Sequence, residues 1–531
     1  MIQTVPRRGF IAGALGGAAL LTSPQILRAQ GMGGRKVVRA IMHAPLGVLD
    51  PVVTNAYMTR NHGYMVYDTL FALDERSQPQ PQMVGETTIS DDGLIYEFRL
   101  RPGMKFHDGS PVTAADCVAS ITRWAKLDLM GGRMVAAASA FEAASADTIR
   151  LVLKQPYGLV LQTLAKPGGS VPFIMPARIA ETPLNQRITE VVGSGPFRFA
   201  QAEFRPGDRI VYERFEGYVP RPEPASGLAG GKAVKLDRVE WMEITDQQTV
   251  MNALTSGEVQ VVENIGADYM AGMRRRRDIT LLTRITNNSL SMRMNWLQAP
   301  FNDLKVRQAV LHAVNQADYL AAQIGDDALS EISPSFYGNG SPYRTEAGAV
   351  RKPDLNRARA LLKESGYAGE TVSILHPADL ASASALAPVT EAMLKSIGMN
   401  PRVDVVDWNT LLARRNKHDP VSEGGWSIVQ GVWTDLDLFS PLINPNLDGR
   451  GRAGYIGWSE SAEIERMKND FAAATDTARQ REIAADIQKL AYERVFAIPL
   501  GSYKVVSGHN AGVRNVIAKQ LLVFWNMELA S

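Results

Sequence analysis

The sequence predicts an α/β fold with more than one domain, on three observations. At 531 residues, the chain is longer than a single hydrophobic core supports. Segments with strand patterns and segments with helical periodicity follow one another along most of its length. A content of 45% hydrophobic and 21% charged residues is ordinary for a globular protein. Because strands that alternate with helices form βαβ units, we expect mostly parallel sheets.

The N-terminal segment is typical of an export signal. Arg7 and Arg8 precede a Gly- and Ala-rich apolar run, Phe10 to Leu21, which is shorter than the roughly 20 residues that span a bilayer. Paired arginines before a weakly apolar run are typical of the twin-arginine route. Since Pro6 stands where Ser or Thr is common, the general secretory route is the alternative. We therefore expect residues 1–29 to be a twin-arginine-type signal peptide and the protein to be periplasmic.

Strand and helix patterns alternate through the first half of the remaining chain. The segment from Lys36 predicts a strand, and a helical stretch begins at Tyr57. Residues 87–100, "TTISDDGLIYEFRL", predict two strands around a turn. Thr113 opens a helical pattern with Asp116 three residues later, which is the spacing of a capping box.

The short segment "FHDGSP" at residues 106–111 brings a histidine and an aspartate together. Asp108 and Gly109 have turn chemistry, because glycine adopts positive φ without strain. His107 has no nucleophile or second metal ligand near it in the sequence. We therefore expect a structural corner, with a catalytic loop as the alternative.

The second half continues the alternation. Residues 302–324 predict one amphipathic helix capped by Asn302 or Asp303, and residues 354–367 predict another that ends at Gly366. The remaining patterns indicate strands at 371–377, 401–408 and 424–433, and helices at 380–398 and 477–495.

The residues that carry common enzyme chemistry are not grouped in the sequence. No two of the seven histidines have the spacing of helical metal ligands, and with one cysteine no thiolate zinc site forms. No phosphate-binding glycine loop and no nucleophile elbow occurs. The 57 Lys and Arg nearly balance the 55 Asp and Glu. We interpret the run Arg274 to Arg277 as a solvated helix face. We expect no enzyme, no cofactor, no metal and no nucleic-acid partner.

Several short motifs occur in a fixed order: "HDG" at 107–109, "GSGPF" at 193–197, "PFNDLKVRQA" at 300–309, "ARALLKESGY" at 358–367 and "AIPL" at 497–500. With the segment "YDTLFALDERSQPQPQMV", they resemble the family 5 extracellular solute-binding proteins, the peptide and nickel binding components of ATP-driven importers. Each motif is mostly turn and cap chemistry, so the specificity lies in their shared order. The resemblance runs from about residue 36 to the C-terminus.

This resemblance implies a two-lobed periplasmic-binding-protein fold of type II, in the large cluster that has an accessory subdomain, with two hinge crossings. We expect the crossings near Thr286 to Asn295 and near Pro499 to Tyr503. The expected divisions are residues 36–75, 191–289 and 498–531 for lobe I, 76–190 for its accessory subdomain, and 290–497 for lobe II.

The resemblance also implies a function. The protein would capture a small solute, a di- or oligopeptide or a peptide-like compound, between its lobes by hinge closure and deliver it to an inner-membrane ABC permease. We expect it to act as a monomer. An exported hydrolase on the same scaffold is one alternative, and a nickel-chelate or haem binder of the same family is another.

Residues that line such a cleft should lie in loops at strand ends near the hinge. Our candidates are His43, Asn55, Tyr57 and Ser194 from lobe I, and Asn295, Trp296, Trp408, Trp433 and Asp435 from lobe II. Tryptophan suits this role because its face stacks and its N–H fixes orientation, although each tryptophan has core packing as its alternative.

One stretch, residues 431–441, resembles the family segment in which peptide binders place a tryptophan and an aspartate that pairs with the ammonium group of the ligand. Asp435 follows Trp433 by two residues, where the dipeptide pattern has a longer gap. Asp437 is therefore the competing candidate for that role.

Overall fold

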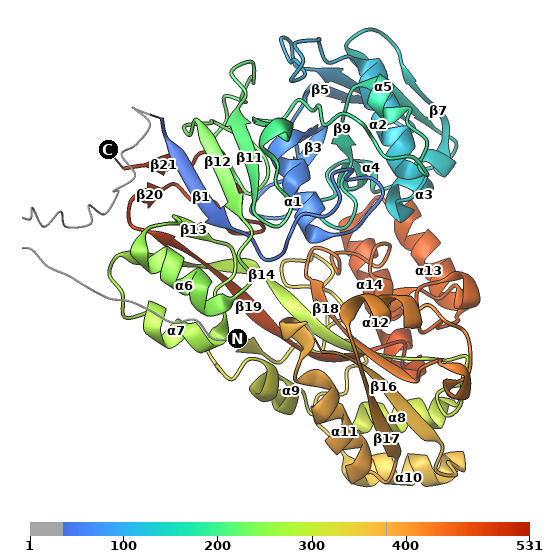
Figure 1. The fold of residues 1–531 in the computed structure, drawn as a ribbon. Coiled ribbons are helices and arrows are strands. Elements are labelled where there is room, and N and C mark those ends of the chain that lie inside the picture. Colours follow the sequence, from blue (N-terminus) through green and yellow to red (C-terminus); the bar gives the residue numbers. More distant parts are fainter. Residues whose placement is uncertain (1–34, 379, 531) are drawn as a thin grey trace, which may run out of the picture. The chain divides into compact units, whose positions relative to one another are not determined.

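The computed structural model describes residues 35–378 and 380–530 (Figure 1). The predicted signal peptide and its twin-arginine route lie outside these residues. The largest element is an 11-stranded sheet with the order β10-β11-β12-β1-β13-β19-β14-β18-β16-β17, and β15 pairs with β19 beside this path. Its strands are β1 (Val37–Ile41), β10 (Phe197–Phe199), β11 (Arg209–Arg214), β12 (Arg238–Met242), β13 (Val261–Val262), β14 (Ile279–Met294), β15 (Ser330–Glu331), β16 (Thr371–Pro377), β17 (Asn400–Val406), β18 (Ile428–Thr434) and β19 (Ile498–Asn510).

We call the part of this sheet from β10 to β13, with its helices, lobe I. Its helices are α1 (Tyr57–Val66), α6 (Gln247–Ser256) and α7 (Ala267–Met273). Neighbouring residues of β1 enter different hydrophobic cores: Ala40 packs in the core that includes α1, and Ile41 packs in the core that includes α6 and α7. Because successive strand residues point to opposite faces, α1 covers one face of the sheet, and α6 with α7 covers the other.

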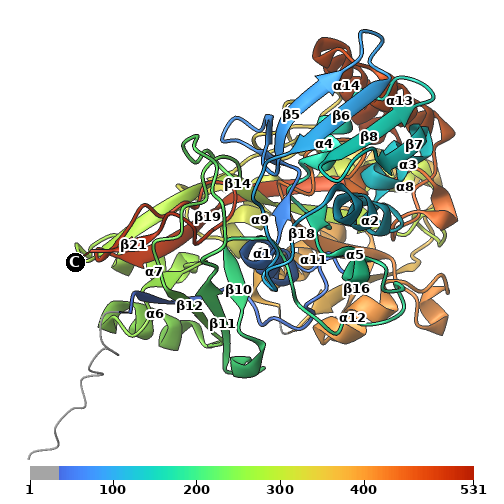
Figure 2. The same ribbon diagram turned by 90° about the horizontal axis from the view of Figure 1, so that it is seen from above.

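Strands β14 and β19 are the hinge strands, since each extends from lobe I into the other half of the sheet. Near one end β19 pairs with β13, and at the other end β14 pairs with β18. They pair antiparallel with each other and lie side by side in Figures 1 and 2. The predicted crossing near Pro499 to Tyr503 lies within β19, and the one near Thr286 to Asn295 lies within β14 except for Asn295. The exact domain boundaries stay predictions.

Lobe II comprises β16, β17, β18 and the helices α8 (Leu304–Ala313), α9 (Gln316–Gln323), α10 (Leu355–Ser365), α11 (Leu386–Ser396), α12 (Trp408–Arg414), α13 (Ala462–Ala473) and α14 (Thr477–Arg494). Asp303 caps α8, and α10 ends at Gly366, where φ is +74°, as predicted. The single helix expected over 302–324 is wrong, because the chain forms α8 and α9. The side chain of Asn315 accepts a hydrogen bond from Ala317 N and starts α9 as a new helix.

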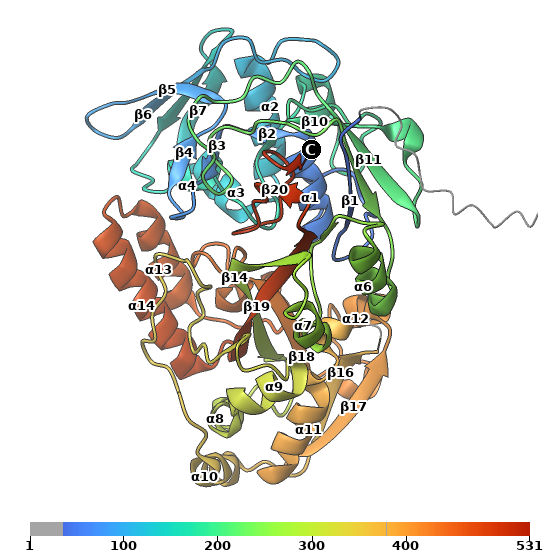
Figure 3. The same ribbon diagram turned by 90° about the vertical axis from the view of Figure 1, so that its left-hand side faces the viewer.

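The accessory subdomain contains the four-stranded sheet β5-β6-β8-β7, made of β5 (Val84–Ile89), β6 (Ile95–Leu100), β7 (Ala138–Ala143) and β8 (Thr148–Leu153). The helices α2 (Ala114–Ala125) and α3 (Leu129–Ala137) pack on it. The predicted capping box of Thr113 and Asp116 is confirmed at the start of α2. Figures 1 and 3 show α3 beside α13 of lobe II, where Arg133 and Glu465 form an ion pair at 3.5 Å.

The segment at residues 106–111 is a structural corner. The His107 ring joins it to the loop that contains Ser194: Nε2 lies 3.0 Å from Gly195 O, and Nδ1 accepts a hydrogen bond from Gly193 N at 3.3 Å. Burial lowers the pKa of His107 to about 4, so the ring stays neutral at physiological pH.

Shorter elements complete the described chain. They are β2 (Asp68–Thr69), β3 (Phe71–Leu73), β4 (Pro79–Pro81), β9 (Phe173–Ile174), β20 (Val513–Arg514), β21 (Glu528–Leu529), α4 (Val160–Leu164) and α5 (Ala177–Ala180). Within residues 35–378 and 380–530, no helix combines the length and apolarity that a membrane span requires.

The expectation of mostly parallel sheets is wrong. In the large sheet, β1 is parallel to β12 and β13, and β16 is parallel to β17 and β18, but the other six ladders are antiparallel. The two hinge strands account for four of these six. Since β14 and β19 pass between the lobes in opposite directions, they pair antiparallel with each other. The neighbouring strands β13, β15 and β18 also run opposite to the hinge strand that each one pairs with.

Candidate functional site

A direct contact between the lobes lies at the start of α1. The Tyr57 hydroxyl donates a hydrogen bond to Asp437 Oδ2 at 2.5 Å and accepts one from Thr434 N at 3.3 Å. The Thr434 hydroxyl donates to the same Asp437 oxygen at 2.7 Å. Burial, followed by the Asp437 carboxylate, raises the pKa of Tyr57 well above its usual range, so the hydroxyl stays a donor. We call Tyr57, Thr434 and Asp437 the contact cluster.

His43 stands beside this cluster, in the loop after β1, with its ring 6.3 Å from the Tyr57 ring. Its Nδ1 lies 2.7 Å from Glu263 Oε2, and its backbone N–H donates to the same oxygen at 3.0 Å. Glu263 is buried and also contacts Asn61 at 3.1 Å and Arg284 at 3.2 Å. Burial alone would raise the pKa of Glu263, but the His43 and Arg284 charges and hydrogen bonds lower it overall. The carboxylate therefore fixes the orientation of His43.

Arg60, one turn into α1, lies under Tyr57. Its guanidinium carbon is 4.8 Å from the centre of the Tyr57 ring. The residue is buried, and its Nη1 has no hydrogen-bond partner among the described residues, while Nε and Nη2 donate to Asn61 Oδ1 at 3.3 and 3.2 Å. The lobe I side of the junction is therefore positively charged beneath Tyr57.

The two aspartates after Trp433 have different environments. Asp435 is buried and accepts hydrogen bonds from Asn287 N at 2.7 Å and from Ser289 Oγ at 3.0 Å, both on β14. Burial raises the pKa of Asp435 to about 7 and outweighs these hydrogen bonds. Asp435 thus faces the hinge strand, whereas Asp437 contacts lobe I.

The structure brings Asn55 to the same junction. Asn55 is exposed in the loop that precedes α1. A Cβ built on Gly169 would lie 3.9 Å from Asn55 Oδ1 and 3.8 Å from Asp437 Oδ1. Asn55, Gly169 and Asp437 therefore meet where lobe I, the segment before β9 and lobe II come together.

Two of the predicted tryptophans are partly buried on lobe II. Trp433, at the end of β18, donates its indole N–H to Ser291 Oγ at 3.0 Å, and its ring stands edge-on to Tyr455 at 5.7 Å. Trp408 begins α12 and packs against the apolar cluster that contains Trp426. Of these two tryptophans, only Trp433 is next to a contact-cluster residue in the sequence, because it immediately precedes Thr434.

Three predicted residues lie away from the contact cluster. Ser194 is buried beside the last turn of α1, because a Cβ on either neighbouring glycine would meet Val66 O. Asn295 is fully buried and donates to Trp426 O at 3.0 Å. Trp296 stacks with Arg307, whose guanidinium carbon is 3.7 Å from the ring centre. Asn295 and Trp296 thus contact neighbours within lobe II, whereas the Ser194 hydroxyl has no hydrogen-bond partner among the described residues.

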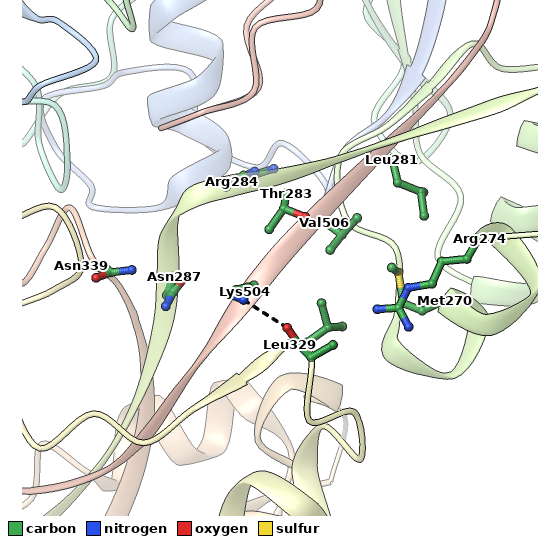
Figure 4. A pocket seen from close by; sticks show the side chains of 11 residues that line it. Met270, Arg274, Leu281, Thr283, Arg284, Asn287, Leu329, Asn339, Lys504 and Val506 are labelled. Atoms are coloured by element: carbon green, nitrogen blue, oxygen red, sulfur yellow. Dashed lines mark hydrogen bonds between the residues drawn. The ribbon is translucent and has the colours of Figure 1, made fainter.

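A cavity of about 640 Å³ adjoins the hinge strands (Figure 4). Its wall includes Met270 and Arg274 from the α7 region of lobe I, Asn287 and Lys504 from the hinge strands, and Asn339 from lobe II. We call it the hinge cavity. Neither Lys504 nor Asn339 stood out in the sequence, because no local pattern marks residues that only the crossing strands bring together. The run Arg274 to Arg277 is exposed, as interpreted, but it follows α7 and does not lie on a helix.

No group of three or more His, Cys, Asp or Glu side chains within the described part of the chain is arranged to hold a metal ion. The site therefore consists of hydrogen-bonding groups, aromatic rings and charges at a junction between lobes. Such an arrangement can bind and enclose a polar solute.

Comparison with known proteins identifies relatives along the whole chain. Residues 78–442 match the family model of bacterial extracellular solute-binding proteins, family 5. A probable peptide ABC transporter periplasmic-binding protein of Sinorhizobium fredii is 37% identical over 99% of this chain and 100% of its own length.

Solved structures share the fold. A dipeptide binding protein from Pseudoalteromonas sp. SM9913, in complex with Met-Leu, superposes with a TM-score of 0.77 at 18% identity, over 93% of this chain and 100% of its own. The periplasmic binding protein AgaA of A. tumefaciens R10, in complex with agropinic acid, gives 0.76 at 21% identity, over 93% of this chain and 99% of its own. These likenesses confirm the predicted two-lobed periplasmic-binding-protein fold.

Proposed function

The chain belongs to the family 5 bacterial extracellular solute-binding proteins, and on this basis we propose that it captures a peptide or peptide-like solute for an ABC importer. The S. fredii relative carries a peptide transport name, and the Pseudoalteromonas protein holds a dipeptide. We propose that lobe closure encloses the solute and that the closed form delivers it, unaltered, to an inner-membrane permease.

The observation that carries this proposal is the pair of hinge strands together with the Tyr57–Asp437 hydrogen bond across the junction. Two lobes joined by two strands can open and close about those strands. A solute favours the closed form only through contacts that it makes there and not in the open form. Moving a two-state balance from 1:99 to 99:1 needs about 5.5 kcal/mol of such preference.

We propose that the cleft is lined by His43, Asn55 and Tyr57 on one side and by Trp433 and Asp437 on the other. Asp437, rather than Asp435, is the better partner for a solute ammonium group. Hydrogen bonds from β14 occupy both carboxylate oxygens of Asp435, whereas the Tyr57 and Thr434 hydroxyls both donate to Oδ2 of Asp437. The Trp433 ring offers an apolar face to a side chain or peptide plane. The domain boundaries, the monomeric state and export by the twin-arginine route belong to the same proposal.

A binding screen with mass spectrometry tests this function. The protein would be incubated with a library of di- and tripeptides, freed of excess compound and denatured, and the released compounds would be weighed. We expect one compound per protein molecule, of unchanged mass, and a stabilisation of about 2.7 kcal/mol at a concentration 100 times the Kd.

Two outcomes would contradict the proposal. Release of a chemically changed compound would favour the hydrolase alternative. Selective retention of nickel chelates or haem, with no peptide, would favour the other alternative. If a peptide binds, Trp433→Ala should weaken its binding about tenfold because the stacking contact is lost. An unchanged affinity would show that Trp433 does not line the cleft.

A further inference from the structure

The hinge cavity has the dimensions of a small-molecule site. Its volume of about 640 Å³ falls inside the range of roughly 300–1,000 Å³ that is usual for ligand pockets. Its wall contains residues of both lobes and of the hinge strands, so its shape depends on how the lobes are arranged. Arg274, which follows α7, forms an ion pair at 3.1 Å with Asp326, which follows α9.

The charge of the lining has one sign. Arg274, Arg284 and Lys504 line the cavity, and the described lining residues include no aspartate or glutamate. Asp326 neutralises Arg274, and Glu263 neutralises Arg284.

Lys504 differs from the two arginines. Its ammonium group donates to Ala328 O at 3.2 Å, at the cavity wall, and no carboxylate of the described residues lies within ion-pair distance of it. Glu331, which accepts from Asn287 at 2.8 Å, is paired with Arg344 at 2.7 Å. Lys504 is therefore the cation of this wall that lacks an acidic partner in the described structure.

The rest of the wall divides into a polar and an apolar part (Figure 4). Asn339 and Asn287 lie on the same side as Lys504, and Arg344 donates to Asn339 Oδ1 at 3.1 Å, so the Asn339 amide nitrogen remains a donor. Met270 and Val506 supply apolar surface toward α7. A molecule that matches this wall has an anionic end and an apolar portion.

We propose that the hinge cavity holds a solute that bears a carboxylate, with the carboxylate beside Lys504 and the apolar portion against Met270 and Val506. The proposal goes beyond the proposed function, because the cavity lining shares no residue with the cleft proposed for the captured solute, so the hinge cavity is a second site. A carboxylate forms charge-assisted hydrogen bonds with an ammonium group and complements a wall without acidic residues. The ligands of this second site are then acidic peptides or peptide-like carboxylates.

The experiment compares tripeptides that differ in the charge of the middle side chain. Ala-Glu-Ala, Ala-Gln-Ala and Ala-Lys-Ala, each with an amidated C-terminus so that the glutamate side chain is the sole carboxylate in the set, would be titrated by calorimetry into the wild type, Lys504→Gln, Lys504→Glu and the control Lys352→Gln. Lys352 is an exposed lysine in the loop before α10, outside the cavity wall. We expect the wild type and the control to bind Ala-Glu-Ala at least tenfold more tightly than Ala-Gln-Ala. Lys504→Gln should remove most of this tenfold preference, which corresponds to about 1.4 kcal/mol.

Charge reversal gives a readout that a merely structural role would not produce. Lys504→Glu should bind Ala-Lys-Ala more tightly than Ala-Glu-Ala, in the opposite order to the wild type. Equal binding of Ala-Glu-Ala and Ala-Gln-Ala by the wild type would overturn the carboxylate assignment but leave solute capture intact. A preference for Ala-Glu-Ala that survives in both Lys504 variants would overturn the assignment to this cavity. Absence of binding by all three tripeptides would overturn this proposal, while the peptide library screen would decide separately whether capture itself fails.

Discussion

Replacing Tyr57 with phenylalanine removes a single hydroxyl from the junction between the lobes. That hydroxyl donates to the Asp437 carboxylate at 2.5 Å and accepts from Thr434 N at 3.3 Å, and both partners belong to lobe II. A hydrogen bond to a charged group contributes about 1.5–3 kcal/mol net. Since the bond exists only while the lobes are together, its loss shifts the balance toward the open form by that amount.

We therefore expect Tyr57→Phe to lower the affinity for the tightest-binding library peptide by roughly 10- to 100-fold, measured by isothermal titration calorimetry. Tyr64→Phe is the matched control on the same helix. Its hydroxyl donates to Pro167 O at 3.2 Å, outside lobe II. The control should lose about 1 kcal/mol of unfolding free energy and keep its affinity. Equal affinities of Tyr57→Phe and wild type would show that this contact does not contribute to closure.

Three further outcomes are expected. Because burial raises the native pKa of Asp435 to about 7, its carboxyl group stays protonated in the folded state between pH 4 and 7 but ionises in the unfolded state, so wild-type stability falls as the pH rises through this range. Asp435→Asn should therefore gain stability over wild type between pH 4 and 7, by at most about 4 kcal/mol in urea unfolding, and a pH-independent difference would contradict this. A Cβ at Gly158 would lie 1.9 Å from Ala474 O of lobe II, so Gly158→Ala should push these two segments apart and weaken peptide binding in calorimetry. Gly512→Ala, which has open space around its Cβ, should leave peptide binding unchanged. Burial raises the pKa of Cys117 and shields its thiol, so in urea a thiol reagent should label Cys117 no faster than the protein unfolds. Rapid labelling of the native protein would refute the burial of Cys117.

Features encoded by neighbouring residues were predictable from the sequence. Thr113 and Asp116 satisfy each other's backbone at the start of α2, and Gly366 ends α10 in the left-handed region. Asn315 is a similar signal that the apolar periodicity of residues 302–324 concealed. These signals act over a few residues, so they survive without knowledge of the fold. The order of such motifs along the chain also identified the family, which the family model confirms.

The candidate site was predictable only in part. The loops after β1 and before α1 were identified, and the structure places His43, Asn55 and Tyr57 from them together. Ser194 was also chosen because it lies in a loop, but that loop packs on the last turn of α1, away from the contact cluster. A loop position indicates accessibility, yet the direction of each side chain depends on what packs against the loop.

By itself, the sequence determined the family, the two-lobed α/β class, the starts of α2 and α8 and the end of α10, because each follows from local chemistry or from the order of motifs. The tertiary structure alone decided the mixed sheet, the pairing of Tyr57 with Asp437 across 380 residues of chain, and the cationic wall of the hinge cavity. These features arise where two long strands carry distant segments past each other. The side chains that meet there have no common periodicity in the sequence, since only packing in three dimensions sets the distance between them.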